Sequence, residues 1–129
     1  MLNDPLAAAL TKIMNAEKVG KREVVLRPAS KMLKVILRLM NEQNYLGMFE
    51  EIDDGKGGHL KVYLLGNINH CGVIKPRFST KYQNVEKWEK RYLPAKDFGV
   101  IFITTPQGIT THLDAKEKQT GGRLLAYVY

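Results

Sequence analysis

The sequence of 129 residues is poor in cysteine, and its single Cys71 cannot form an internal disulfide. Structural disulfides are typical of oxidising compartments, and this sequence gives no sign of such a compartment. We therefore expect a cytoplasmic protein. A signal peptide is not expected either. The opening "MLNDPLAAAL" has no basic residue, and Lys12 soon ends its apolar stretch. We therefore expect a soluble chain.

Histidine is scarce as well, and the three histidines, His59, His70 and His112, lack the compact spacing of a metal site. His70 and Cys71 are adjacent, so in a strand their side chains would point to opposite faces and could not form a nucleophile and base pair. The glycine-rich "GKGGH" leads into a strand rather than a helix, which argues against a phosphate-binding loop. We expect no metal, no cofactor and no enzymatic activity.

Negative charge is the third shortage, with 13 Asp and Glu against 20 Lys and Arg, a formal net charge of +7 and a pI near 9.5. Basic residues concentrate in segments 12–38 and 75–91, whereas "EEIDD" at 50–54 is acidic. Either basic segment alone could be ordinary solvated surface. Together they favour a polyanionic partner.

The first half of the sequence predicts the order helix, strand, helix, strand, strand. Asp4 followed by Pro5 is typical of a helix start, and apolar residues at helical spacing continue to about Lys18. "REVVLRP" predicts a strand closed by Pro28, and Ser30 can cap a second helix. "YLGMFEEI" and "HLKVYLLG" predict two strands joined by a glycine-rich hairpin. The second helix has an apolar face of Met32, Val35, Ile36, Leu39 and Met40 and a basic stripe of Lys31, Lys34 and Arg38.

The second half is predicted to be mainly β. "GVIKPRFST" indicates a strand broken by Pro76, and "NVEKWEKRYLP" a short helix capped by Asn84. "FGVIFIT" is typical of a buried strand. Thr111 can cap a helical turn that Gly121 and Gly122 end, and "RLLAYVY" predicts a last strand.

These elements predict an α+β fold with two subdomains. Residues 1–68 form an α/β subdomain, in which two helices pack against a three-stranded sheet. Residues 69–129 form a mainly β subdomain with short helices. With 44% hydrophobic residues, the chain can build real cores.

The stretch "TTPQGITTH" after the buried strand is the best candidate for recognition. Hydroxyls of Thr104 and Thr105 can bond to phosphate, ribose or a base edge, and Gly108 would let a nucleic-acid backbone approach closely. A catalytic threonine would need a neighbouring base, and none lies at a predictable distance. From composition alone, an ordinary turn is an equally good interpretation.

Four stretches of the chain resemble one family: "NAEKVGKREVVLRPASK", "GVIKPRF", "LPAKDFGVIFITTPQGITTH" and "TGGRLLAYVY". Over essentially its whole length the sequence is similar to small ribosomal subunit protein eight in its archaeal and eukaryotic form. The hydroxyl-rich loop of that family is Ser-Thr-Ser-x-Gly, and Pro106 departs from it by removing a hydroxyl and a backbone donor. Bacterial relatives carry a Glu after the Gly-Gly pair, where this chain has Arg123.

The resemblance implies a structural ribosomal protein that binds an irregular helix in the central domain of small-subunit ribosomal RNA and supports assembly of the subunit. The C-terminal subdomain would make most of the contacts. Neighbouring small-subunit proteins are implied partners, and binding to its own messenger RNA is left open. A general RNA- or DNA-binding architectural protein is the alternative. The residues expected to bind RNA are Asn15, Ser30, Lys31, Lys34, Arg77, Lys81, Thr104, Thr105, Gln107, Gly108, Gly121, Gly122 and Arg123.

Overall fold

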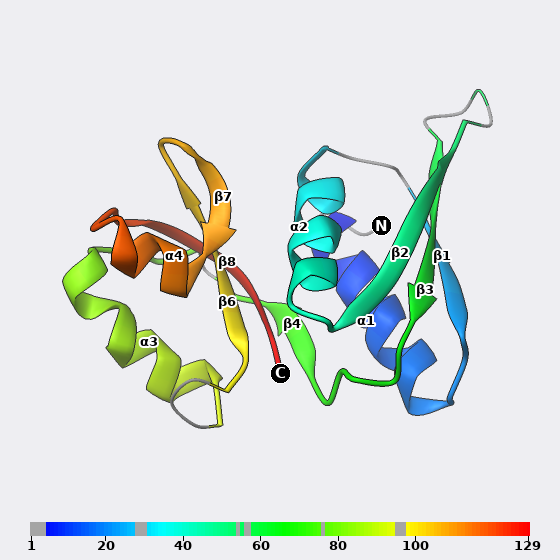
Figure 1. Ribbon diagram of the computed structural model, residues 1–129, viewed down its shortest axis with the longest axis horizontal. Coiled ribbons are helices and arrows are strands. Elements are labelled where there is room, and N and C mark those ends of the chain that lie inside the picture. The colour runs from blue at the N-terminus through cyan, green and yellow to red at the C-terminus, as the bar shows by residue number, and fades with distance from the viewer. Residues whose placement is uncertain (1–4, 28–30, 54, 56–57, 76, 95–97) are drawn as a thin grey trace. The chain divides into compact units, whose positions relative to one another are not determined.

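The computed structural model describes residues 5–27, 31–53, 55, 58–75, 77–94 and 98–129. The chain divides into two compact units, an N-terminal unit of residues 1–69 and a C-terminal unit of residues 70–129. Each unit combines helices with an antiparallel sheet (Figure 1), so the predicted α+β class is confirmed. Within the described residues, no helix has the length and apolar character needed to span a membrane.

The N-terminal unit contains two helices and a three-stranded sheet of order β1-β3-β2, in which β3 pairs antiparallel with both neighbours. This matches the predicted order of elements. Its elements are α1 (Pro5–Lys18), β1 (Glu23–Leu26), α2 (Lys31–Glu42), β2 (Leu46–Ile52) and β3 (His59–Leu64).

The core of the N-terminal unit lies where α1 and α2 pack on the sheet (Figure 1). Strands β1 and β3 bury every second residue, as expected for a half-covered sheet. The predicted apolar face of α2 is partly wrong. Met32, Val35 and Leu39 are only half-buried, because the helix turns a neighbouring i, i+3, i+4, i+7 row toward the sheet. That row is Leu33, Ile36, Leu37 and Met40.

The C-terminal unit has a five-stranded sheet of order β4-β8-β6-β7, with the short β5 pairing beside β8. Both pieces of the predicted strand around Pro76 therefore exist, although Pro76 itself lies outside the described residues. The elements are β4 (Cys71–Val73), β5 (Ser79–Thr80), the 3₁₀ helix η1 (Tyr82–Asn84), α3 (Val85–Tyr92), β6 (Val100–Thr105), β7 (Gly108–Thr111), α4 (His112–Glu117) and β8 (Gly122–Val128).

A hydrophobic cluster of eight buried residues helps to hold the C-terminal unit together. Ile101 and Ile103 contribute from one face of β6, and both are fully buried. The ring of the buried His112 accepts a hydrogen bond at Nδ1 from the backbone N–H of Ile101 at 3.0 Å, which ties the start of α4 to β6. The cluster comprises Ile74, Val85, Trp88, Leu93, Ile101, Ile103, Ala115 and Leu124.

Three predictions about local structure were wrong or incomplete. Strand β7 was not expected. The Asn84 side chain caps nothing, because Asn84 closes η1 with φ −103° and ψ 4° rather than the extended backbone of a capping residue. Helix α4 ends before the glycine pair, since Gln119 already adopts a left-handed φ of 55°. The Thr111 cap is confirmed. The predicted roles of Asp4, Pro28 and Ser30 concern residues outside the described part of the chain.

Candidate RNA interface

The threonine-rich stretch forms a tight hairpin between β6 and β7. Thr105 pairs with Gly108, and Pro106 and Gln107 make the two-residue turn. The Thr105 hydroxyl donates to the carbonyl of Gly108 at 2.8 Å and accepts from the N–H of Gln107 at 3.2 Å. Its only proton is thus committed to the turn. Gly108 has φ 124°, a conformation that favours glycine.

Two further threonines also serve the fold. The hydroxyl of Thr110 donates to Oδ2 of Asp114 at 2.7 Å, and the hydroxyl of Thr111 accepts from the backbone N–H of Asp114 at 3.3 Å. The hydrogen bond from Thr110, followed by that from Lys118, lowers the pKa of Asp114. Both hydroxyls therefore stabilise the start of α4.

Thr104 differs from the other three. It is half-buried, and its hydroxyl makes no hydrogen bond to any residue that the structure describes. The register places it opposite Arg123 of β8 on one side and Ile109 of β7 on the other. Ser79 of β5 lies opposite Arg123 in turn. Directly opposed residues share a face of a sheet, so these four side chains form one row across the strands, which we call the Thr104 row.

The glycine pair makes the close approach of these strands possible. A Cβ on Gly122 would collide with the carbonyl oxygen of Thr104 and lie 2.8 Å from Cγ2 of Ile103. A Cβ on Gly121 would meet the carbonyl oxygen of Thr80. Both glycines thus have a structural role that the sequence did not reveal, and it accounts for them without any contact to a ligand.

Two shallow hollows adjoin β5 and share Thr80 and Lys81 as lining residues. The larger, of about 530 Å³, adds Asn84, Lys87 and Trp88. The smaller, of about 280 Å³, reaches Gly121 and so connects Lys81 to the start of β8. Thr80, Asn84 and Lys87 were absent from the predicted site. The polar run "FSTK" after Pro76 was the signal available for Thr80. Arg77 is exposed between β4 and β5 and lines neither hollow.

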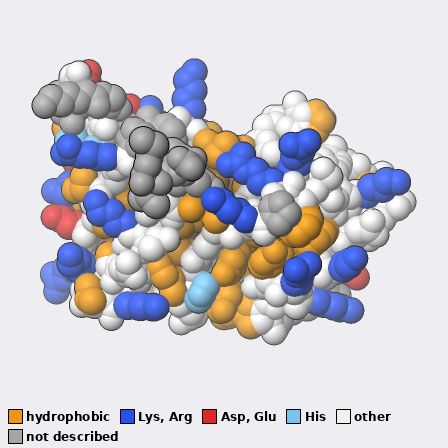
Figure 2. Space-filling view, turned by 180° about the vertical axis from the view of Figure 1, so that it is seen from behind, with side chains coloured by type: hydrophobic (Ala, Val, Ile, Leu, Met, Phe, Trp, Pro, Cys, Tyr) orange, Lys and Arg blue, Asp and Glu red, His pale blue; other side chains and the backbone are white. Residues whose placement is uncertain are grey.

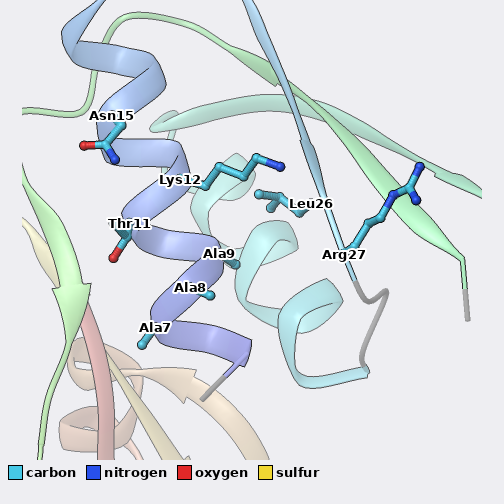
Figure 3. A pocket seen from close by; sticks show the side chains of 8 residues that line it. All are labelled: Ala7, Ala8, Ala9, Thr11, Lys12, Asn15, Leu26 and Arg27. Atoms are coloured by element: carbon cyan, nitrogen blue, oxygen red, sulfur yellow. The ribbon is translucent and has the colours of Figure 1, made fainter. Parts of the chain in front are cut away.

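In the N-terminal unit, Asn15 is exposed on α1 and helps to line a hollow of about 490 Å³ between α1 and the end of β1. Lys12 reaches from α1 toward Leu26 and Arg27 in this hollow (Figure 3), so two cations that were not in the predicted site accompany Asn15.

The predicted basic stripe of α2 is not uniform. Lys31 and Arg38 are exposed, whereas the Nζ of Lys34 lies 2.7 Å from a carboxylate oxygen of Glu51 on β2. Lys34 therefore already has an anionic partner, which the sequence did not predict. Ser30 lies outside the described residues.

The two units differ in charge. Residues 1–69 contain ten Lys and Arg against eight Asp and Glu, whereas residues 70–129 contain ten against five, leaving formal charges of +2 and +5. On the face seen in Figure 2, blue basic side chains are widespread and red acidic ones are few. This arrangement favours a polyanion, with the stronger attraction at the C-terminal unit.

A comparison with protein families gives a match that covers residues 4–129, to the family described as Ribosomal protein S8. Members of this family are structural proteins of the small ribosomal subunit that bind ribosomal RNA, and the family is not one of enzymes. The match confirms the family to which the sequence was likened, and it agrees with the positive charge and the polar strand ends described above.

Proposed function

The chain belongs to the ribosomal protein S8 family, and we propose that it is an archaeal or eukaryotic-type member that recognises an irregular helix in the central domain of small-subunit ribosomal RNA. Arg123, in place of the Glu of bacterial relatives, supports that type. In this role the protein acts on the ribosome, beside neighbouring small-subunit proteins, and supports assembly by holding its RNA helix in a folded form. A messenger RNA that presents the same irregular helix would bind to the same surface.

The observation that carries the proposal is the Thr104 row. The Thr104 hydroxyl, which has no hydrogen-bond partner among the described residues, lies across from the exposed guanidinium of Arg123, at the end of a sheet whose buried strands hold both in place. A regular A-form helix hides its base edges in a deep groove, whereas an internal loop exposes bases and ribose hydroxyls. Thr104 would hydrogen-bond to such a group, while Arg123 and Lys81 would contact phosphate.

Thr105, Gln107 and Gly108 take a different part in this proposal. Because the Thr105 hydroxyl is bonded within the turn, it shapes the hairpin that presents Thr104. Gly108 leaves open space where a Cβ would stand, so RNA can approach the turn closely. Asn15, Lys31 and Arg77 would add contacts to the RNA backbone that contribute affinity without sequence information.

The experiment compares binding of two RNAs at one fixed salt concentration: a fragment with the irregular helix and a regular duplex of equal length. Thr104→Val keeps the shape of the side chain and removes its hydroxyl. We expect cognate binding to weaken by about 1–3 kcal/mol, because the RNA partner of the hydroxyl is left desolvated and unpaired. Duplex binding should stay unchanged.

Thr105→Val is the matched control, since it makes the same chemical change one residue away, where the hydroxyl is bonded internally. It should leave the ratio of cognate to duplex affinity nearly unaltered. If Thr104→Val also leaves this ratio unchanged, other residues recognise the irregular helix. If the wild type binds both RNAs equally, the protein is a general RNA- or DNA-binding architectural protein.

A further inference from the structure

Six aromatic side chains of the C-terminal unit form a continuous array, of which only Trp88 lines a hollow described above for the candidate RNA interface. Neighbouring ring centroids lie between 4.8 and 6.4 Å apart along the whole series. The rings come from the residues directly before β4 and β5, from α3, from β8 and from the residue after β8. The aromatic array consists of His70, Phe78, Trp88, Tyr92, Tyr127 and Tyr129.

At one end of the aromatic array, three rings are nearly parallel. His70 makes interplanar angles of 6° with Tyr127 and 13° with Tyr129, and the two tyrosines lie at 19° to each other. With centroids 5.6 to 6.2 Å apart, these rings are offset. His70 is exposed, and Tyr127 and Tyr129 are half-buried.

The backbone fixes this arrangement. His70 and Tyr129 exchange two backbone hydrogen bonds of 3.0 and 2.9 Å, which extend the ladder between β4 and β8. Gly72 is paired with Tyr127, and a Cβ there would lie 3.2 Å from the tyrosine hydroxyl oxygen, so the ring crosses the space that glycine leaves. That hydroxyl is 3.0 Å from Nδ1 of His70. Burial raises the pKa of Tyr127 above its usual range.

Packing explains only one side of these rings. Phe78, Tyr92, Tyr127 and Tyr129 contact the hydrophobic cluster with part of their surface. His70 is exposed, however, and two cations lie over the other end of the array, at Phe78, Trp88 and Tyr92. The Arg91 guanidinium is 5.6 to 5.8 Å from three ring centroids, and the Lys87 ammonium is 5.8 Å from that of Trp88. Flat apolar faces beside cations complement unpaired bases on a phosphate backbone.

We propose that the aromatic array is a second RNA-binding surface, on which unpaired bases of a single-stranded segment stack against His70, Tyr127 and Tyr129 while Arg91 and Lys87 attract the phosphates. A protein partner would bury the same rings, but the surplus of basic residues in this unit favours RNA. The surface goes beyond the proposed function, because recognition by the Thr104 row needs none of these rings.

The test uses a short fluorescein-labelled oligo(A), which contains no helix, and follows its anisotropy together with the fluorescence of Trp88, the only tryptophan. Because Trp88 belongs to the hydrophobic cluster and lies outside the three stacking rings, its emission reports whether the unit stays folded. The double variant His70→Ala/Tyr129→Leu should bind oligo(A) about 5- to 150-fold more weakly, the range measured for loss of one base–aromatic stack. Phe98→Ala, which removes an exposed aromatic side chain of the same unit outside the array, should bind like the wild type.

Arg91→Gln is a second variant that keeps the fold, because Arg91 is exposed on α3. It should also weaken oligo(A) binding and is decisive if the double variant does not fold. Normal oligo(A) binding in Arg91→Gln and in the folded double variant would overturn the proposal and leave the array to a protein partner. Thr104→Val should bind oligo(A) normally, so failure of the proposed function and failure of this second surface give different results.

Discussion

The N-terminal and C-terminal units both pack helices on an antiparallel sheet and contain equal numbers of basic residues, but they differ in where the ion-paired basic residues lie. In the N-terminal unit, ion pairs join Lys34 to Glu51 and Lys61 to Glu23 across the sheet surface. In the C-terminal unit, ion pairs join Lys116 to Glu89 and Lys118 to Asp114 at α4, whereas Lys81 and Arg123, which lie at strand ends, have no ion pair among the described residues. The number of cations is therefore a poor guide to where a polyanion binds, and their pairing is a better one.

The largest expected effect tests whether the core of the C-terminal unit is scaffold only. Ile101→Ala should lower the free energy of unfolding by about 2–5 kcal/mol, because Ile101 is fully buried among the hydrophobic cluster. The substitution keeps the backbone N–H that His112 accepts from. Thermal or urea denaturation followed by circular dichroism gives the measurement.

Ile36→Ala in α2 is the matched change in the N-terminal unit, where the side chain is equally buried. RNA affinity of the folded fraction should be nearly normal for both variants. A loss of affinity at unchanged stability for Ile101→Ala alone would contradict the division of β6 into a scaffold strand and a recognising end.

The next largest effect concerns the turn. Thr105→Val should reduce the free energy of unfolding by about 0.5–1.5 kcal/mol, since both hydrogen bonds of the hydroxyl within the hairpin are lost. Thr104→Val should change stability less, because its hydroxyl has no partner among the described residues. Equal losses of stability for the two variants would contradict the assignment of the Thr105 hydroxyl, and not that of Thr104, to stabilising the turn.

Local signals predicted much of the fold. Both N-terminal helices, the hairpin strands, the buried strand at Val100–Thr105 and the Thr111 cap follow from spacing and residue type within a few positions. Strand β7 was not predicted, because Pro106 and Gly108 indicate a turn and only three β-forming residues, Ile109 to Thr111, follow before the next helix. Asn84 failed as a cap because a 3₁₀ turn precedes α3, and nothing local in the sequence marks that turn.

The site was less predictable, because its decisive features join residues far apart in sequence. Lys34 meets Glu51, and Arg123 comes opposite Thr104, through sheet register and helix packing. The aromatic array depends on the contact between His70 and Tyr127, 57 positions apart. The glycine pair is evident in the sequence, but only the structure shows that the carbonyl oxygen of Thr104 occupies the space where a Cβ of residue 122 would lie.

A smaller effect is expected in the salt dependence of RNA binding. Each phosphate contact adds about 1 to the magnitude of the negative slope of log affinity against log salt concentration. Lys31→Gln should lower the magnitude of that slope by about 1 if Lys31, which is exposed, contacts one phosphate. Lys34→Gln should lower it less, because Lys34 is paired with Glu51. Equal changes for the two variants would mean that RNA displaces Glu51 without difficulty.

The smallest expected effect follows from removing the carboxylate of Glu51, which pairs with Lys34. Glu51→Gln frees Lys34, so affinity for the cognate RNA should rise modestly and the salt slope should steepen by up to about 1. Stability should change by less than about 1 kcal/mol, because the ion pair is partly exposed and screened by solvent. Glu23→Gln is the control, since it frees Lys61 of β3 and changes the net charge equally. If both variants bind RNA alike, only net charge matters and the α2 surface is ordinary solvated surface; if Glu51→Gln alone binds more tightly, ion pairing is what limits the contribution of the N-terminal unit.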